Sequence, residues 1–538
     1  MSHRRISLFL MITFTAVAVF ATSSLAQRSC ESLTALKLAD TTIVSAAEVA
    51  AGPFSVPREG PLPPESLTVP AFCRVGGVIK PTADSDIKFE VWMPDHGWNG
   101  KFEGVGNGGF AGSINYRDLA TALRAGFAAT STDTGHEVVG MPENANWALS
   151  HPEKIADFGY RAIHLTSVIA KIIVHDFYGS APRQSYFSSG SNGGRQGLME
   201  AQRFPSDYDG IIAGAPANFW THLMVDAIWL AQALYANPVS YIPATKLPAI
   251  HDAVLAACDA NDGVKDGIIN DPRQCHFRAE TLLCHGPETD ACLTAPQVTA
   301  LKKIYAGPTD SKGQQLFPRT VPGGELGPNS WRIWITGHPP TNKGVGFLFG
   351  THFFSDVIFD NPTWDFRTFN FDADVQLTDK KMARVLNATD PKLTAFKARG
   401  GKLILYHGWA DPAISPLNTV NYYNSVLATM GREQTESFVR LYMVPGMTHG
   451  PGGSGPDSFG ALPEPNADPS HSMFSSLQQW VERGIAPHAI IATKYAQPPG
   501  AARVAEMTRP LCPYPQAAQY KGSGDIHDAA NFVCKLEQ

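Results

Sequence analysis

One strand–turn–helix segment constrains what this chain can fold into more than any other feature. Residues 184–188 resemble a short strand, residues 189–193 are small or polar, and a helix is expected to begin near Gly194. A nucleophilic serine at such a sharp turn needs small residues two positions before and after it. Ser191 has a serine and a glycine there, whereas the neighbouring serines have aromatic residues two positions before them. The segment favours Ser191 as a nucleophile, although the usual first glycine is missing and a plain turn is the alternative.

Two further loops supply the partners that a nucleophilic serine needs. Asp411 follows the apolar run at 402–406, and His449 follows the apolar run at 439–444. Serine, then aspartate, then histidine, each after a strand, is the chain order of the α/β-hydrolase fold. We therefore expect His449 to accept the Ser191 proton and Asp411 to orient the imidazole.

Such chemistry also needs backbone N–H donors for the developing oxyanion. One is expected from Asn192, the residue after the nucleophile. The other is expected from the glycine-rich loop at 106–109, where Gly109 or Gly108 is favoured. A plain strand-to-helix turn is the alternative for this loop, and a phosphate-binding loop fits poorly because the Lys-Ser/Thr ending is absent.

The chain shows one α/β pattern with a long interruption. Strands are expected at 101–105 and 126–130, and an amphipathic helix at 156–177. The pattern stops near residue 215, gives way to a segment rich in aromatic residues, and resumes near residue 398. We therefore predict an α/β-hydrolase domain formed by 27–214 and 398–538, with 215–397 as an inserted lid; a separate binding module is the alternative for the middle.

The amino terminus has the pattern of a signal peptide over residues 1–26. Two arginines precede a short apolar run, and Ser24-Leu25-Ala26 fits the small-residue cleavage pattern. A membrane anchor is the alternative, but the apolar run is short for a spanning helix. We expect a secreted or periplasmic protein.

Charge and composition exclude other classes of partner. The net charge is −6, charged residues make up 17% of the chain, and no block of like charge occurs. Nucleic acids and anionic membrane surfaces attract basic patches, so neither is an expected partner, and no membrane association is expected after signal cleavage.

Eight cysteines, an even number, fit an oxidising compartment. Their layout suggests pairing between neighbours in the sequence, although the sequence alone permits other connectivities. The expected pairs are Cys30–Cys73, Cys258–Cys275, Cys284–Cys292 and Cys512–Cys534.

Together these motifs resemble the tannase and feruloyl esterase family over nearly the whole chain after residue 26. The resemblance implies hydrolysis of esters of aromatic acids without an organic cofactor, with the lid forming the acid-binding pocket. Related proteins act on gallate, hydroxycinnamate or terephthalate monoesters. The matching stretches are 106–115, 186–197, 205–216, 258–277, 406–416 and 443–450.

An acidic loop begins at Cys258 in the expected lid. Its spacing does not fit an EF-hand, because the fifth position counted from Asp259 is a glycine and no glutamate closes the loop. The resemblance instead implies a structural Ca²⁺ in the lid, and a solvated acidic turn is the alternative. The implied ligands are the side chains of Asp259, Asp262 and Asp266 and the carbonyls of Val264 and Ile268.

The chain departs from the family pattern beside the nucleophile. In many members a disulfide joins the residue before the serine to the residue after the histidine. Here these positions are Gly190 and Gly450. The geometry of Ser191 and His449 is then expected to depend on packing and backbone turns.

Two other functions remain open from the sequence. A terephthalate-monoester hydrolase needs a cation for the free carboxylate, and Arg319, Arg332 or Arg367 could supply it. A non-catalytic extracellular protein that binds calcium or carbohydrate is disfavoured by the Ser/Asp/His set. The preferred aromatic acid and the oligomeric state are left open.

Overall fold

The computed structural model describes residues 28–57, 65–138, 143–338, 341–496 and 503–536. The expected signal peptide at 1–26 lies outside these residues. Among the helices in the described ranges, none is both long and apolar enough to cross a bilayer.

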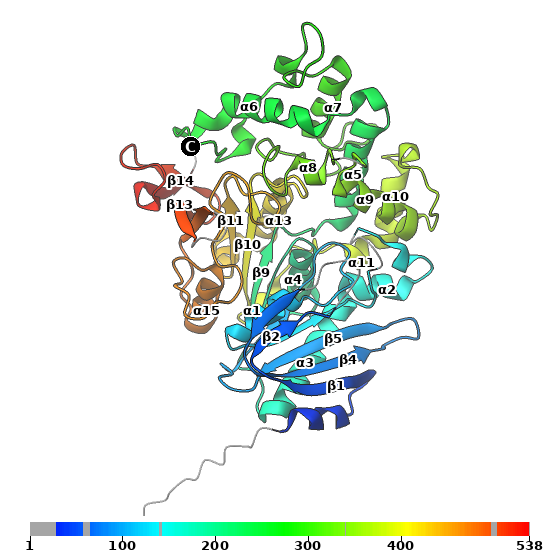
Figure 1. The fold of residues 1–538 in the computed structure, drawn as a ribbon, viewed down its shortest axis with the longest axis vertical. Helices are drawn as coiled ribbons and strands as arrows, with labels where there is room; N and C mark the ends of the chain where they lie inside the picture. The colour runs from blue at the N-terminus through cyan, green and yellow to red at the C-terminus, as the bar shows by residue number, and fades with distance from the viewer. Residues whose placement is uncertain (1–27, 58–64, 139–142, 339–340, 497–502, 537–538) are drawn as a thin grey trace, which may run out of the picture.

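A mixed sheet of nine strands forms the centre of the molecule (Figure 1). The last five strands in the order below are parallel neighbours, and β6 also pairs in parallel with β7. The first three strands are antiparallel to their neighbours. The order across the sheet is β1 (Thr41–Val49), β4 (Phe72–Ile79), β5 (Ile87–Pro94), β7 (Ala128–Thr132), β6 (Lys101–Val105), β8 (Gln184–Gly190), β9 (Gly210–Gly214), β10 (Lys402–Gly408) and β11 (Val439–Val444).

Helices cover both faces of the sheet, which is why the central strands are apolar without alternation. One face packs against α3 (Ala162–Tyr178), α4 (Asn192–Arg203) and α13 (Pro416–Met430). The other packs against α1 (Tyr116–Arg124) and α15 (Met473–Arg483). The short helices α2 (Pro152–Ala156) and α14 (Arg432–Glu436) lie in connections. This is the α/β-hydrolase fold that the sequence predicts.

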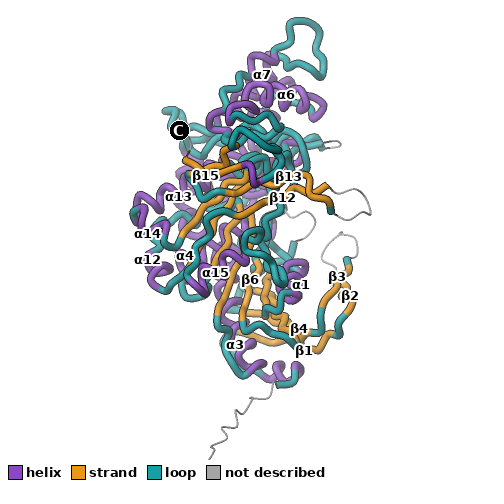
Figure 2. The backbone as a smooth tube through the Cα atoms, turned by 90° about the vertical axis from the view of Figure 1, so that its left-hand side faces the viewer, coloured by secondary structure: helices purple, strands orange, loops and turns teal. Residues whose placement is uncertain are grey.

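The chain between β9 and β10 contributes no described strand to this sheet. We call residues 215–397 the inserted segment. Figures 1 and 2 show most of its helices beyond one end of the sheet, with α6 and α7 farthest out, whereas its last helix lies beside α4. Its helices are α5 (Trp220–Tyr235), α6 (Leu247–Cys258), α7 (Ala295–Ala306), α8 (Trp331–Trp334), α9 (Val345–His352), α10 (Ala373–Thr378), α11 (Arg384–Leu386) and α12 (Thr394–Ala398), of which only α12 extends one residue past the segment.

Three small antiparallel pairs complete the described structure. The first is β2 (Gly52–Ser55) with β3 (Ser66–Val69). The others are β12 (Ile490–Ala496) with β13 (Val504–Leu511), and β14 (Gln516–Tyr520) with β15 (Phe532–Leu536). Figure 1 shows β13 and β14 beside the inserted segment, and Val264 of that segment packs with Cys512 and Phe532.

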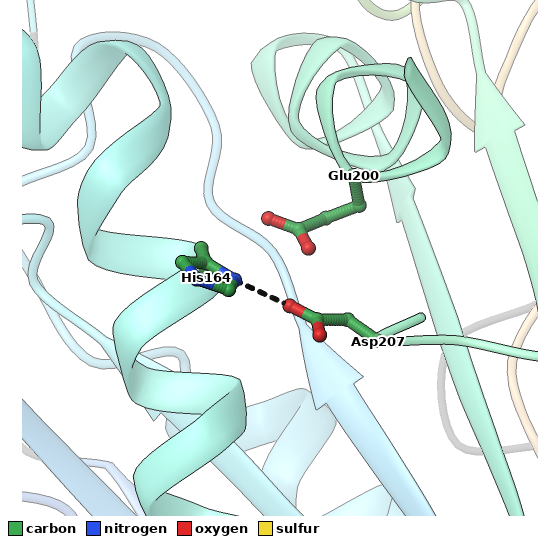
Figure 3. A group of neighbouring side chains, drawn as sticks. All are labelled: His164, Glu200 and Asp207. Atoms are coloured by element: carbon green, nitrogen blue, oxygen red, sulfur yellow. Dashed lines mark hydrogen bonds and ion pairs between the residues drawn. The ribbon is translucent and has the colours of Figure 1, made fainter. Parts of the chain in front are cut away.

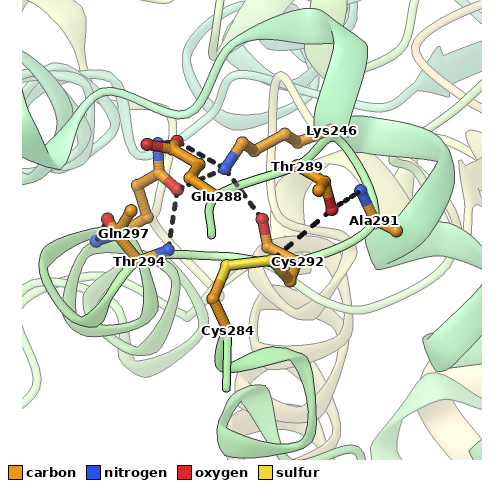
Figure 4. Close-up of a disulfide and its surroundings, with 8 residues drawn as sticks. All are labelled: Lys246, Cys284, Glu288, Thr289, Ala291, Cys292, Thr294 and Gln297. Carbon is orange, nitrogen blue, oxygen red and sulfur yellow. Dashed lines mark hydrogen bonds and ion pairs between the residues drawn. A yellow bond between two sulfur atoms is a disulfide. The ribbon is translucent and has the colours of Figure 1, made fainter. Parts of the chain in front are cut away.

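All eight cysteines form disulfides, and the pairs are the four neighbouring pairs expected from the sequence. Figure 4 shows the surroundings of the Cys284–Cys292 bridge in the inserted segment. There the buried Lys246 Nζ donates to Glu288 Oε1 at 2.7 Å, to the Cys292 carbonyl at 2.7 Å and to Gln297 Oε1 at 2.9 Å. Because a buried ammonium is costly unless it is fully hydrogen-bonded, these contacts fix the short loop that the disulfide closes.

Element boundaries differ from the sequence expectation at some strands, for example β7, which spans Ala128–Thr132 in place of 126–130, and at two helices. The helix expected near Gly194 begins at Asn192, directly after Ser191. The helix expected over 156–177 is an α-helix only from Ala162, and it is joined to α2 by a π-helical turn at Asp157–Arg161. None of these shifts displaces a candidate site residue.

Candidate active site

Ser191 lies at the sharp turn between β8 and α4. Its φ is 61° and its ψ is −125°, a conformation that non-glycine residues rarely adopt. The turn is held by backbone hydrogen bonds on both sides: the Ser191 amide donates to the Gly214 carbonyl at 2.8 Å, and the Ser191 carbonyl accepts from Ala217 at 3.1 Å. Strain of this kind persists only where surrounding structure enforces it, and it projects the hydroxyl away from the sheet.

The structure also shows why a serine is tolerated at position 189, where the usual pattern has glycine. A Cβ at Gly193 would lie 1.9 Å from Ser189 Oγ, and one at Gly106 would lie 2.7 Å from the same oxygen. The two glycines therefore leave the space that the Ser189 side chain occupies.

The three predicted side chains Ser191, Asp411 and His449 come together at the carboxyl ends of β8, β10 and β11. His449 Nε2 lies 3.1 Å from Ser191 Oγ, and His449 Nδ1 lies 2.7 Å from Asp411 Oδ2. Both distances are those of hydrogen bonds, and the histidine is placed between the serine and the carboxylate. This is the geometry that a nucleophile, its base and an orienting acid require.

A second histidine contacts the same carboxylate. His407 Nε2 lies 3.1 Å from Asp411 Oδ2, and its Nδ1 lies 2.7 Å from Thr419 Oγ1. Burial by itself raises the pKa of Asp411, but the charges and hydrogen bonds of His449 and His407 outweigh it and hold that pKa below its usual range. The sequence reasoning missed His407, although a histidine at the end of the strand, four residues before the acid, was a visible signal.

The other oxygen of Asp411 is fixed by the backbone. Asp411 Oδ1 accepts from the amides of Ala413 at 2.8 Å and Ile414 at 3.0 Å. Because both oxygens have partners, the carboxylate is fixed and remains ionised although it is only 1% exposed.

The glycine-rich loop lies beside the nucleophile, as expected. Gly109 and Asn192 line the same pocket as Ser191 and His449, whereas Gly108 is not among the described lining residues. The loop is tied to α4, because the Asn107 amide donates to Gln196 Oε1 at 3.0 Å and Gln196 Nε2 donates to Asn107 Oδ1 at 3.2 Å. Between the two expected glycines, the structure favours Gly109.

A largely apolar pocket opens beside these side chains, between the sheet and the inserted segment. Trp334 of α8 meets the His449 ring edge-on at 4.8 Å between centroids and stacks with Phe349 of α9 at 6.3 Å. Both belong to the aromatic residues that mark the expected lid, although the sequence did not single them out as lining the pocket. The remaining lining residues are Ala217, Trp220, Leu223, Met224, Asp226, Ala227, Leu230, Gly346, Pro412, Ala413 and Ile414.

The acidic loop of the inserted segment is rich in oxygen donors, but Asp259, Asp262 and Asp266 are not among the described side chains that lie close enough together to share an ion. Asp259 Oδ1 accepts from the amides of Asp266 at 3.3 Å and Gly267 at 3.0 Å, so the loop folds around this carboxylate. Carboxylates and carbonyls are the ligands that the hard cation Ca²⁺ takes. One carboxylate already has a partner, because Asp266 Oδ2 lies 2.8 Å from Arg509 Nη2 and both side chains are almost wholly buried.

A different group of side chains lies near enough to share a metal ion (Figure 3). His164, Glu200 and Asp207 each offer an atom within 4.8 Å of the others, and His164 Nδ1 lies 2.6 Å from Asp207 Oδ2. Burial raises the pKa of Glu200 well above its usual range, and Asp207 adds to the shift. The raised pKa of Glu200 favours its protonated form, and a proton there lowers the repulsion between the two neighbouring carboxyl groups.

Comparison with known proteins gives the site a family context. The family model for tannase and feruloyl esterase matches residues 73–535. An uncharacterized esterase of Xanthomonas campestris pv. campestris is 43% identical over 98% of this chain and 94% of its own length. A probable feruloyl esterase B of Aspergillus clavatus is 35% identical over 86% of each chain.

Solved structures agree with this result. The crystal structure of feruloyl esterase B from Aspergillus oryzae superposes with a TM-score of 0.85 at 30% identity, covering 94% of this chain and 99% of its own. A tannin acyl hydrolase from Aspergillus niger has a TM-score of 0.71 at 23% identity, covering 93% and 92%, and shares the fold.

Proposed function

The chain belongs to the tannase and feruloyl esterase family and is a carboxylic ester hydrolase; we propose that it cleaves esters of phenolic acids through an acyl-enzyme on Ser191. The observation that carries the proposal is the hydrogen-bonded series from Ser191 through His449 to Asp411. Membership of an esterase family argues against the alternative of a non-catalytic protein that binds calcium or carbohydrate.

The first half of the reaction forms the acyl-enzyme. Ser191 Oγ attacks the ester carbonyl while His449 Nε2 accepts its proton, and the negative charge of Asp411 stabilises the resulting imidazolium. The backbone N–H groups of Asn192 and Gly109 stabilise the oxyanion. Collapse of the tetrahedral intermediate breaks the ester bond, and His449 returns the proton to the leaving alcohol.

The second half releases the acid. A water molecule gives a proton to His449 and attacks the acyl carbonyl, and breakdown of the second intermediate returns the proton to Ser191. Trp334 covers one edge of the His449 ring. This cover limits solvent around the base, where charge interactions are therefore stronger.

The pocket supports an aromatic acyl group. Its side chains are mostly apolar, and Trp334 and Phe349 offer ring faces and edges suited to a flat substrate. Arg319, Arg332 and Arg367 are absent from its described lining residues, and so is any lysine. The pocket therefore lacks the cation that a terephthalate monoester would require.

The decisive experiment is hydrolysis of methyl ferulate by wild type and Ser191→Ala. Because Ser191 is the proposed nucleophile, we expect the variant to lose at least about a thousandfold in kcat with an unchanged circular dichroism spectrum. Equal rates for the two proteins would contradict the proposal. A panel with methyl gallate, methyl caffeate and a terephthalate monoester then ranks the acids.

Two further properties belong to the proposal. We infer that the acidic loop binds a structural Ca²⁺ through Asp259, Asp262 and Asp266 and the carbonyls of Val264 and Ile268; its oxygen donors support this role. We also infer export with cleavage after Ala26 to the periplasm or beyond. The four disulfides support an oxidising compartment.

A further inference from the structure

Asp226 is the one acidic side chain that lines the pocket beside Ser191, among the lining residues described. It lies in the middle of α5, where it is the only Asp, Glu, Lys or Arg. Leu223, Ala227 and Leu230 line the same pocket from positions one helical turn before it, next to it and one turn after it. Residues at these spacings share one face of a helix, so the carboxyl is on the face of α5 that borders the pocket.

The described residues do not account for this carboxyl. The residue is 5% exposed, and its Oδ1 is buried without a hydrogen-bond partner. It caps no helix end, and no ion pair of Asp226 occurs among the described residues. A buried polar atom without a partner lowers stability, so its position in the pocket points to a partner that arrives with the substrate.

The charge state of Asp226 limits what that partner can be. Burial raises the pKa of its carboxyl to about 8, with no charged neighbour contributing. Near pH 7 the group is therefore mostly neutral and offers one O–H donor together with acceptor oxygens. A neutral hydroxyl complements such a group, because it can both donate and accept. A free carboxylate would enter an apolar pocket that has no cation to receive it.

We propose that Asp226 is a specificity-determining residue that hydrogen-bonds a phenolic hydroxyl on the ring of the bound acid. This inference rests on the proposed function and assigns its substrate class: hydroxylated aromatic acids rather than unsubstituted or carboxylated ones. The ring lies among apolar side chains such as Trp334 and Phe349, and its hydroxyl reaches the buried oxygen on α5. A site built to bind a hydroxyl strongly disfavours analogues that lack one, because its own polar group is then left unpaired.

The test compares two esters that differ only in the ring hydroxyl, methyl 4-hydroxycinnamate and methyl cinnamate. Wild type, Asp226→Asn and Asp226→Leu are assayed for kcat and KM with both esters and with 4-nitrophenyl acetate. We expect wild type to prefer the hydroxylated ester by about tenfold or more in kcat/KM, which is the effect of one hydrogen bond of ordinary strength. Asp226→Leu should abolish this preference, mainly through KM, and Asp226→Asn should keep part of it because an amide both donates and accepts.

The outcomes distinguish a failure of the role given to Asp226 from a failure of the proposed function. If Asp226→Leu loses activity equally on both cinnamates, or if wild type shows no preference for the hydroxylated ester, Asp226 does not bind the ring hydroxyl. The proposed esterase function would not be affected by this result. If wild type hydrolyses 4-nitrophenyl acetate and neither cinnamate, the proposed aromatic acyl specificity is wrong. An unchanged circular dichroism spectrum and an unchanged Tm show that Asp226→Leu is folded, so that a changed substrate preference is not a loss of structure.

Discussion

His407 lies at the end of β10 and Asp411 follows it four residues later; Nε2 of the histidine is 3.1 Å from Oδ2 of the aspartate, the same oxygen that faces His449. One carboxylate oxygen therefore serves two imidazoles. His407 is fully buried and is itself fixed by Thr419. It acts as a positioning residue, because it touches the acid and not the substrate.

Replacing His407 should remove one of the hydrogen bonds that hold Asp411 while leaving the Asp411 side chain itself in place. We expect His407→Leu to lower kcat for methyl ferulate by about tenfold with little change in KM, far less than the loss caused by disabling the triad aspartate. His407→Gln, which can still donate to Asp411, should recover part of the loss. Thr419→Val is the matched control, because it leaves Nε2 in place and frees only Nδ1. A wild-type kcat in His407→Leu would show that His449 and the amides of Ala413 and Ile414 suffice to hold Asp411 in place.

The free energy of unfolding should depend on pH through the ionisation of Glu200. Its pKa is raised in the folded protein, so its contribution to the free energy of unfolding is complete below its unfolded pKa and is lost as pH rises toward the folded value. Glu200→Gln should therefore be more stable than wild type at pH 8 by about 1 kcal/mol or more, since a tenfold change in proton affinity corresponds to about 1.4 kcal/mol. The two proteins should converge near pH 4.

Urea unfolding at the two pH values measures this difference. Glu464→Gln, at an exposed position, is the control that removes the same charge without relieving burial. If Glu200→Gln were less stable than wild type at pH 8, Glu200 would be ionised in the fold. A metal shared with His164 and Asp207 would then be the better explanation of the group.

Removing Ca²⁺ should lower stability and leave the chemistry intact. We expect chelation with EGTA to lower Tm, while kcat at temperatures well below Tm stays at its original value, because the acidic loop contributes no residue to the pocket beside Ser191. Asp259→Asn should show a similar Tm without chelator and no further drop with it. Asp252→Asn, an exposed acid on α6, should respond to EGTA as wild type does. A Tm that chelation leaves unchanged would contradict the site.

Cysteines at positions 190 and 450 should form the disulfide that this chain lacks. The neighbouring Ser191 and His449 side chains are 3.1 Å apart, and a Cβ at Gly190 or Gly450 would meet no atom closer than 3.6 Å. Gly450 has a φ of +85°, so the new side chain there carries some strain. Thiol titration of Gly190→Cys/Gly450→Cys under oxidising conditions should find no free thiol. Two titratable thiols would show that the loops are too far apart.

The features that the sequence predicted well are local ones. Ser191, Asp411 and His449 each follow an apolar strand in a loop of small residues, and parallel strands bring such loops to one edge. The cysteine pairs are close in sequence, so short loops already favour them.

The features that were missed depend on tertiary partners. Asp226 lies in an apolar helix, and the helix sequence does not indicate which residues face its carboxyl. His407 contacts Asp411 only because the chain turns back after β10. The antiparallel strands β1, β4 and β5 were also missed. Part of the cause is the outer strand β1, which is mostly exposed and shows only an irregular alternation.

The four disulfides each join residues on the same side of the junction between the inserted segment and the hydrolase sheet. Their partners are separated by 43, 17, 8 and 22 residues, and no bridge connects the helices above the pocket to the strands below it. The disulfides thus cross-link each part separately, and the contacts between the two parts, such as the Asp266–Arg509 ion pair, are non-covalent. Reduction of the disulfides should therefore loosen each part internally, while the contacts that hold the helices over Ser191 contain no bond that a reducing agent can break.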